Sequence, residues 1–406
     1  MDRIVVVGAS LAGLWACESL RAGDYSGAIT LIGAELHQPY DRPPLSKALL
    51  KGEMEPERIQ LRKPDELGKL GLDLRLGNSA VALDLENRTV TLQSGETIAA
   101  DGVVIATGSA PRPLPGQPDL DGVTMLRTLD DSLALRRRLA DQPHVVVIGA
   151  GFIGLEVAAS AAQGGCTVTV LEGAPAPMMR GLGAEMGEVV ARVHARHGVD
   201  VRCGVQVAAI VGDSGRVTGV RLGTGEVVFA DVVVVGIGVS PSTEWLDGSG
   251  LEIRDGIVCD DSLRAAPGIY AAGDCARWVN NLFGVAGEEM RVEHWTNAAE
   301  QGAAAARNLL AELAGEAPTP YAPVPFFWSD QFDSRIQFVG RAHGDDEVSV
   351  ILGDVDDKFV AMYGHGGRLR GVLGVGMPKP VMRMRKLISD RASWDAAVTY
   401  AAELAQ

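Results

Sequence analysis

The feature that most constrains the fold is an internal repeat of a β-branched run, a glycine-rich turn and an apolar stretch. The segment VVVGASLAGL (residues 5–14) returns 141 residues later as VVIGAGFIGL (residues 146–155). A buried strand that turns through glycines directly into a helix is typical of units that bind the pyrophosphate of a dinucleotide. The repeat therefore predicts two such units, and with them an α/β fold built on parallel sheets.

The second copy has the complete pattern. A strand at 145–148 is followed by Gly149, Gly151 and Gly154, a helix at 155–163, a strand at 167–171 and finally Glu172. The first glycine permits the tight turn, the second lets the backbone approach a pyrophosphate, and the third lets helix and strand pack closely. Glu172 can accept hydrogen bonds from both hydroxyls of an adenosine ribose and would repel a 2′-phosphate. We therefore expect NADH to be preferred over NADPH.

The first copy is less regular. Gly8 and Gly13 are in place, but Ser10 stands where the middle glycine belongs. Its Cβ would crowd a close pyrophosphate, although its hydroxyl can donate a hydrogen bond to one. Glu35 closes the strand that follows, at 29–32, and is the candidate for the ribose contact. A doubly wound unit that has lost its ligand remains the alternative for this copy.

Two proline clusters, at 111–118 and 318–325, predict the domain boundaries, because proline fits poorly inside helices and central strands. We expect one domain from residues 1–110 and 237–317, which carries the first glycine motif. A second domain, at 111–236, is inserted into it and carries the second motif. A C-terminal domain covers residues 318–406.

Charge and cysteine content exclude several classes of protein. The net charge of −15 argues against nucleic acid or an acidic membrane as the main partner. No apolar run reaches the 18 residues of a membrane helix, and a strand begins right after Met1, so we expect no signal peptide and a cytoplasmic location. Five cysteines without CxxC spacing predict neither disulfides nor a dithiol redox centre, and the seven histidines show no metal-ligand spacing, so no metal is expected.

Two further motifs reveal a family resemblance. DGVVIATG (residues 101–108) is a buried strand that ends in Thr107 and Gly108, and GIYAAGD (residues 268–274) ends in Gly273 and Asp274. With the two glycine loops, these motifs resemble the two-dinucleotide-binding flavoprotein reductases, with their ATG and GD motifs. The resemblance implies FAD as the second nucleotide, with Asp274 on its ribityl chain.

Three more segments narrow the resemblance. HQPYDRPPLSK (37–47), LRTL (126–129) and FFWSDQ (326–331) look like the NADH-dependent ferredoxin reductases of the putidaredoxin reductase group, which serve cytochrome P450 and Rieske-type oxygenases. A disulfide reductase would need a cysteine beside the flavin, and none follows Glu35. The resemblance implies an oxidoreductase that passes electrons from NADH through FAD to a [2Fe-2S] ferredoxin, with an α+β C-terminal domain.

The resemblance also implies roles for individual residues. Lys47 and Glu156 would form the catalytic pair beside the flavin N5, where the ammonium stabilises the negative charge that hydride transfer brings. The residues expected at FAD are Gly8, Ser10, Leu11, Ala12, Gly13, Glu35, Arg42, Lys47, Ala80, Thr107, Gly108, Arg127, Gly273, Asp274, Trp295 and Trp328. The residues expected at NADH are Gly149, Gly151, Phe152, Ile153, Gly154, Glu156, Glu172, Arg180, Gly236 and Gly238.

Other interpretations remain open at this stage. A flavin-dependent NADH oxidase or quinone reductase is an alternative enzyme, and an NADH-sensing flavoprotein is a non-catalytic alternative. Basic residues gather between 358 and 391, and we expect Lys379, Arg383, Arg385 and Lys386, with Arg335, to attract an acidic ferredoxin. An ordinary solvated helix face would carry the same charges. The spacing NAAE at 297–300 predicts the N-terminal capping box of a helix that ends near Leu313.

Overall fold

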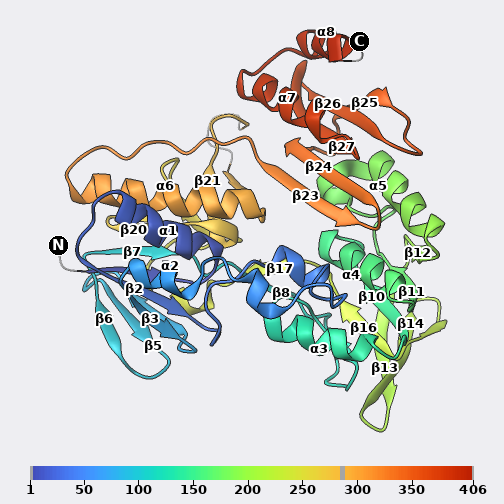
Figure 1. Ribbon diagram of the computed structural model, residues 1–406, viewed down its shortest axis with the longest axis horizontal. Helices are drawn as coiled ribbons and strands as arrows, with labels where there is room; N and C mark the ends of the chain where they lie inside the picture. The colour runs from blue at the N-terminus through green and yellow to red at the C-terminus, as the bar shows by residue number, and fades with distance from the viewer. Residues whose placement is uncertain (1–2, 284–288, 405–406) are drawn as a thin grey trace. The chain divides into compact units, whose positions relative to one another are not determined.

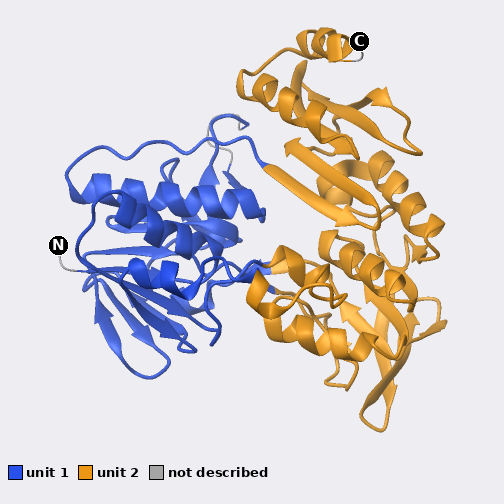
Figure 2. Ribbon diagram, viewed as in Figure 1, with its two compact units in different colours: residues 1–41, 59–110, 240–325 blue, residues 42–58, 111–239, 326–406 orange. Residues whose placement is uncertain are grey.

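The computed structural model describes residues 3–283 and 289–404, and its chain divides into two compact units (Figures 1 and 2). Unit 1 comprises residues 1–41, 59–110 and 240–325. Unit 2 comprises residues 42–58, 111–239 and 326–406. The chain therefore leaves unit 1 and returns to it twice before it ends in unit 2.

The centre of unit 1 is a six-stranded sheet in the order β19-β20-β7-β1-β2-β3, of which Figure 1 labels β20, β7, β2 and β3. β1 lies in the middle and runs parallel to both neighbours, with Val5 opposite Thr30 on one side and Val103 on the other. Helices cover parallel sheets on their faces, which explains the runs of β-branched residues in β1 and β7. The strands are β1 (Arg3–Val7), β2 (Ala28–Gly33), β3 (Leu72–Leu76), β7 (Gly102–Ile105), β19 (Arg264–Ala266) and β20 (Ile269–Ala271).

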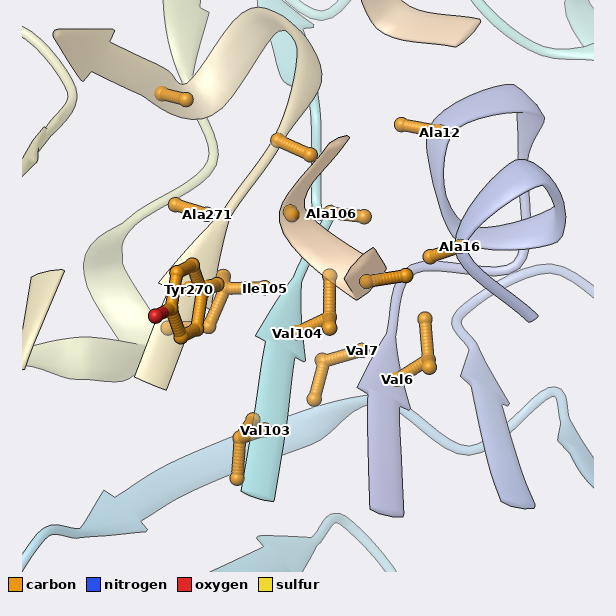
Figure 3. Close-up of a cluster of buried hydrophobic side chains, with 14 of the residues drawn as sticks. Val6, Val7, Ala12, Ala16, Val103, Val104, Ile105, Ala106, Tyr270 and Ala271 are labelled. Atoms are coloured by element: carbon orange, nitrogen blue, oxygen red, sulfur yellow. The ribbon is translucent and has the colours of Figure 1, made fainter. Parts of the chain in front are cut away.

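Two helices, α1 (Leu11–Ala22) and α6 (Trp295–Leu313), pack against each other in unit 1. A Cβ on Gly302 of α6 would lie 2.1 Å from the carbonyl oxygen of Ala12, so the two backbones meet where a side chain would not fit. Figure 3 shows Ala12 and Ala16 of α1 beside the buried side chains of β1, β7 and β20. This packing fixes the glycine turn that joins β1 to α1.

Two small three-stranded sheets and one short α-helix also belong to unit 1. One three-stranded sheet is β4 (Ala80–Asp84), β5 (Thr89–Leu92) and β6 (Thr97–Ala99), and the other is β18 (Ile257–Cys259), β21 (Ala276–Val279) and β22 (Glu289–Arg291). The short helix is α2 (Pro64–Lys69).

Unit 2 contains a second parallel sheet, in the order β12-β11-β10-β16-β9. Its central strand β10 has the same place as β1 in unit 1, directly before a glycine turn and a helix. The strands are β9 (Val123–Thr124), β10 (His144–Ile148), β11 (Thr167–Leu171), β12 (Asp200–Arg202) and β16 (Val232–Val235). The helices are α3 (Leu129–Leu139), α4 (Phe152–Gln163) and α5 (Met179–Arg196), and a three-stranded meander is formed by β13 (Val207–Asp213), β14 (Arg216–Leu222) and β15 (Val227–Phe229).

The C-terminal part of unit 2 is an antiparallel sheet in the order β23-β24-β27-β26-β25, followed by two helices. Phe327, Phe338 and Phe359 from three of its strands join the same buried cluster as Val145 and Ala158 of the nucleotide-binding part. The elements are β23 (Phe326–Gln331), β24 (Ser334–Gly340), β25 (Glu347–Gly353), β26 (Phe359–His365), β27 (Arg368–Val375), α7 (Pro378–Ser389) and α8 (Trp394–Leu404).

The fold class predicted from the sequence is confirmed, since a mainly parallel sheet in unit 1 and a parallel sheet in unit 2, each with a glycine turn, precede an α+β C-terminal part. The strand at 167–171 has the predicted bounds, whereas α4 begins three residues earlier than expected, at Phe152. The prediction of a capping box at 297–300 is wrong. α6 begins at Trp295, after His294 in extended conformation, so Asn297 lies inside the helix. The Nδ2 of Asn297 donates to the carbonyl of Val292. The division into three domains stays a prediction.

Candidate functional site

The glycine turn after β10 has the shape that a dinucleotide pyrophosphate requires. Gly149 has a φ of +102°, and a Cβ there would lie 2.4 Å from the carbonyl oxygen of Gly236. A Cβ on Gly154 would lie 2.2 Å from the carbonyl oxygen of Gly149. By contrast, a Cβ on Gly151 would meet nothing within 4 Å. This open space lies at the N-terminus of α4, where the helix favours a negatively charged group, so the turn fits a pyrophosphate.

Glu172 follows β11 and holds this turn in place. Its Oε2 accepts a hydrogen bond of 2.6 Å from the amide of Ala150, and its Oε1 accepts one of 2.8 Å from the amide of Ala174. A carboxylate has about four acceptor sites, so both oxygens can still accept a bond from a ribose hydroxyl. Arg180 is exposed, and its Nη1 would lie 4.0 Å from a Cβ on Gly238. The predicted NADH residues thus gather around one loop.

The turn after β1 in unit 1 repeats this geometry. Gly8 has a φ of +123°, and a Cβ there would lie 2.0 Å from the carbonyl oxygen of Ala106, at the end of the neighbouring β7. A Cβ on Gly13 would lie 1.9 Å from the carbonyl oxygen of Gly8. Ser10 stands in extended conformation before α1, and its side chain makes no capping hydrogen bond to the helix. The hydroxyl of Ser10 therefore does not cap the helix, and the turn fits a second pyrophosphate.

Asp274 lies in the same unit as this turn. Its Oδ2 accepts a hydrogen bond of 2.8 Å from the hydroxyl of Ser109, the residue after Gly108. Gly273 has a φ of +79°, and its amide donates to Oε1 of the fully buried Gln301 on α6, at 2.8 Å. Sequence reasoning missed both Ser109 and Gln301. Together they fix the orientation of the carboxylate that the resemblance assigns to the FAD ribityl chain.

Glu35 and Trp295 each have a polar partner within unit 1. The hydroxyl of Tyr40 donates to Oε2 of Glu35 at 2.5 Å, and the indole Nε1 of Trp295 donates to Oδ1 of Asp41 at 2.6 Å. Both partners belong to the segment 37–47 that carries the family signature. The signature residues therefore orient two of the side chains predicted to contact FAD.

Lys47 and Glu156 form an ion pair inside unit 2, with 2.6 Å between Nζ and Oε2. The side chain of Glu156 is 3% exposed and that of Lys47 is 17% exposed. Two buried hydroxyls also donate to this carboxylate, from Ser46 to Oε2 at 2.5 Å and from Ser329 to Oε1 at 2.6 Å. Charge-assisted hydrogen bonds of this kind fix a carboxylate in one orientation. Glu156 stands two residues after Gly154, so the pair is anchored to the NADH loop.

Ser329 is the first member of a longer buried chain of hydrogen bonds. Its hydroxyl accepts a bond of 3.0 Å from Nε2 of Gln331, and Oε1 of Gln331 lies 2.9 Å from Nε2 of His194. His194 is fully buried, and burial lowers its pKa from 6.5 to about 4. The imidazole is therefore neutral at pH 7, and Glu156 is connected to a rigid polar network.

The segment 42–58 is anchored to unit 2 by polar contacts besides the ion pair. The hydroxyl of Ser132 donates to the carbonyl of Leu45 at 2.7 Å, and that of Ser160 donates to the carbonyl of Ser46 at 2.6 Å. Arg42 donates from Nη1 to the carbonyl of Arg127. These bonds bring together three residues that the sequence analysis named separately: Arg42, Lys47 and Arg127.

The predicted basic surface of the C-terminal part lies largely on one face of α7. Lys379, Arg383 and Lys386 are exposed and follow helical spacing, while Val381 and Met384 are buried beneath them. Lys386 also pairs with Asp390 at 2.7 Å, and Arg385 is half-buried. Arg335 belongs to β24 and not to this helix, and its guanidinium lies 5.9 Å from the ring centre of Trp328.

The predicted cofactor residues divide between the two units. Unit 1 holds Gly8, Ser10, Leu11, Ala12, Gly13, Glu35, Ala80, Thr107, Gly108, Gly273, Asp274 and Trp295. Unit 2 holds Arg42, Lys47, Arg127, Gly149, Gly151, Phe152, Ile153, Gly154, Glu156, Glu172, Arg180, Gly236, Gly238 and Trp328. Their roles stay predictions, with two nucleotide loops in separate units.

All five cysteines are free, and burial raises the pKa of Cys275, the cysteine beside Asp274. Over residues 3–283 and 289–404, none of the helices has the length and apolar character that crossing a membrane requires.

Comparison with known families and proteins agrees with this geometry. The family described as pyridine nucleotide-disulphide oxidoreductase matches residues 2–302, and the family described as reductase C-terminal matches residues 326–404. Rhodocoxin reductase of Rhodococcus erythropolis is 40% identical over 390 residues, which cover 95% of this chain and 89% of that protein.

Two further relatives cover nearly the whole chain. The ferredoxin–NAD(+) reductase component of an anthranilate 1,2-dioxygenase system from Burkholderia cepacia is 37% identical over 398 residues, covering 97% of this chain and 96% of that protein. The crystal structure of a covalent putidaredoxin reductase–putidaredoxin complex matches with a TM-score of 0.91 and 33% identity, covering 100% of this chain and 99% of that chain.

Proposed function

Because the chain belongs to the pyridine nucleotide-disulphide oxidoreductase family and carries its reductase C-terminal domain, we propose that it is an NADH:ferredoxin reductase. Electrons pass from NADH through FAD to a small [2Fe-2S] ferredoxin, which supplies a cytochrome P450 or a Rieske-type oxygenase. The proposal rests chiefly on the buried Lys47–Glu156 pair next to a complete dinucleotide loop. The names of relatives that serve a dioxygenase system or bind putidaredoxin support the choice of acceptor.

FAD and NADH are the cofactors of this family, and the chain has one glycine cradle for each. At the first, the turn at Gly8 and Gly13 would hold the pyrophosphate of FAD, with Ser10 donating and Asp274 oriented toward the ribityl chain. At the second, the turn at Gly149 and Gly151 would hold the pyrophosphate of NADH. FAD, when bound, takes up two electrons with a hydride and releases them one at a time.

Glu172 determines the choice of nicotinamide cofactor in this proposal. Both of its oxygens are already held by backbone amides, which fix the carboxylate where the adenosine ribose would lie. A fixed carboxylate accepts hydrogen bonds from ribose hydroxyls and repels a 2′-phosphate. NADH is therefore the reductant, and Arg180 is the one cation among the NADH residues named above that could offset such a phosphate.

Lys47 and Glu156 act in the hydride step. The ammonium of Lys47 supplies a fixed positive charge where negative charge arrives. Glu156 holds this ammonium through its Oε2 and is itself held by the hydroxyls of Ser46 and Ser329. The three donors leave the carboxylate a single orientation, so the ammonium is placed before the substrate binds and little reorganisation is needed during the reaction.

A comparison of electron acceptors tests the proposal. With NADH as reductant, we expect kcat/KM for a [2Fe-2S] ferredoxin of the putidaredoxin type to exceed those for dioxygen and for a soluble quinone by at least about 100-fold. Faster reduction of the quinone or of dioxygen would identify a quinone reductase or an oxidase. Slow turnover with every acceptor, and a long-lived complex of the reduced protein, would identify an NADH sensor.

The same proposal places the reaction in the cytoplasm. All five cysteines are free, and structural disulfides are rare in a reducing compartment. Fractionation of the native cells, followed by immunodetection, would check this location.

A further inference from the structure

Histidine and aspartate side chains come together at one end of the C-terminal sheet, and none of them is among the residues used above. His343, Asp345 and Asp346 lie in the turn between β24 and β25, and His365 is the last residue of β26. Because β25 and β26 are antiparallel and Glu347 pairs with Gly364, the turn and the strand end meet. From these contacts we propose a binding site for a divalent transition-metal ion, with Zn²⁺ as the best match.

The donor atoms are close enough to share one ion. His343 Nδ1, Asp345 and His365 Nδ1 offer ligand atoms that all lie within 4.8 Å of one another, and in the described part of the chain this is the one such group of three or more. His343 Nδ1 contacts Oδ1 of Asp345, and His365 Nδ1 lies 3.6 Å from the same oxygen. Ligands about 2.1 Å from a tetrahedral Zn²⁺ are about 3.4 Å apart, so only small side-chain shifts would close the site.

Asp346 supplies an independent observation. Its side chain is 1% exposed, and its Oδ2 accepts a hydrogen bond of 2.6 Å from the amide of His343. Its Oδ1 is buried and has no hydrogen-bond partner, yet it lies 3.4 Å from Nδ1 of His365. A buried carboxylate oxygen without a donor costs free energy, and a cation bound at this point would compensate for that loss.

The chemistry of the four donors selects the class of ion. Two imidazoles and two carboxylates balance a divalent charge, and imidazole favours Zn²⁺, Cu²⁺ and Ni²⁺ over Mg²⁺ and Ca²⁺. Arg370 on β27 is the nearby cation whose charge acts on Asp346 together with those of the two histidines. Two carboxylates outweigh this single guanidinium. The bound ion would tie the turn before β25 to the end of β26, a role separate from electron transfer.

Direct metal binding tests the site. Tag-free, FAD-loaded enzyme would be titrated with ZnCl₂ by calorimetry, and Co²⁺ would be used as a spectroscopic substitute for Zn²⁺. We expect one ion per chain, the absorption spectrum of tetrahedral Co²⁺, and a higher thermal midpoint in the presence of zinc. The variants His343→Ala, His365→Ala and Asp346→Asn should each bind at least about 10-fold more weakly.

His197→Ala is the matched control. His197 is also half-exposed and lies 3.7 Å from a carboxylate, that of Asp333, but no second histidine takes part in the pair. This variant should bind zinc as the parent does. If the histidines and aspartates form only ion pairs and bind no metal, the result is different: the parent does not bind zinc, or it binds zinc with an affinity that His343→Ala and His365→Ala leave unchanged. Either outcome would overturn the proposal.

Discussion

Replacing Lys47 with methionine should both slow the hydride step and weaken the fold. The change keeps the length of the side chain and removes its charge, which leaves the Glu156 carboxylate, 3% exposed, without its cation. Removing one partner of a buried ion pair costs about 3–5 kcal/mol. Lys47 is 17% exposed and two hydroxyl donors remain, so we expect the lower end, about 3 kcal/mol. For a unit of this size, such a loss lowers the thermal midpoint by roughly 6–12 °C.

The effect on catalysis is a separate quantity. A preorganised donor to developing charge contributes about 2.7–4 kcal/mol, so the loss of Lys47 should slow flavin reduction by NADH about 100-fold. Anaerobic rapid mixing, followed at the flavin absorbance band, measures this rate, and the FAD content should stay unchanged. The double variant Lys47→Met/Glu156→Gln removes both charges of the pair. Its thermal midpoint should return most of the way to that of the parent, whereas its rate of flavin reduction should stay low.

Lys51→Met is the matched control, because Lys51 lies in the same segment and pairs with Glu53 at 3.0 Å, but Glu53 is exposed. Exposed pairs contribute about 0–1 kcal/mol, so this variant should reduce its flavin and unfold like the parent. If Lys47→Met is reduced at the parent rate, Lys47 has no part in the hydride step. If the double variant recovers the rate as well, the pair is structural only.

Three further sets of variants test the choice of nicotinamide cofactor, the ferredoxin-docking surface and the buried histidine. NADH should be preferred over NADPH by at least about tenfold in kcat/KM, and Glu172→Ala should narrow this ratio; equal values in the parent would contradict the role of Glu172. Reversing Arg383 and Lys386 to Glu should raise the KM for an acidic ferredoxin several-fold at low salt and leave ferricyanide reduction unchanged, whereas unchanged ferredoxin kinetics would place the docking surface elsewhere. Burial lowers the pKa of His194 from 6.5 to about 4 in the folded protein, so the unfolded chain binds a proton here at a higher pH than the fold does. The folded protein therefore loses stability as the pH falls from 6.5 toward 4. By pH 5 the loss should be about 2 kcal/mol, and the thermal midpoint of His194→Gln should fall less than that of the parent between pH 7 and pH 5; identical slopes would refute this.

The nucleotide loops could be predicted from sequence because local chemistry dictates them. Gly8 and Gly149 have positive φ, which favours glycine. A Cβ at either of them, or at Gly13 or Gly154, would clash with backbone atoms, so the glycine motif in the sequence directly predicts the shape of the turn. Runs of β-branched residues likewise gave the bounds of β11 correctly. The capping rule failed at Asn297 because the helix begins two residues earlier, at Trp295, and the side-chain amide of Asn297 donates to the carbonyl of Val292 instead of capping the helix.

The partners of the charged side chains could not be predicted in the same way. Ser46 and Ser329 both donate to Glu156, although they are 110 and 173 residues away from it in sequence. Ser109 and Asp274 are 165 residues apart. Such pairs depend on how strands and segments pack, which no spacing rule encodes. Ser46 and Ser329 do lie inside two of the quoted family signatures, and that was the one available signal.

The electron balance of the reaction distinguishes a ferredoxin reductase from an NADH oxidase. NADH delivers two electrons and a [2Fe-2S] ferredoxin accepts one, so the proposed activity requires two reduced ferredoxins for each NADH consumed. We predict this ratio in anaerobic single-turnover mixing, and in air we predict that NADH consumption requires ferredoxin. NADH consumption that proceeds equally well without ferredoxin, with peroxide or water as the product, would contradict the account.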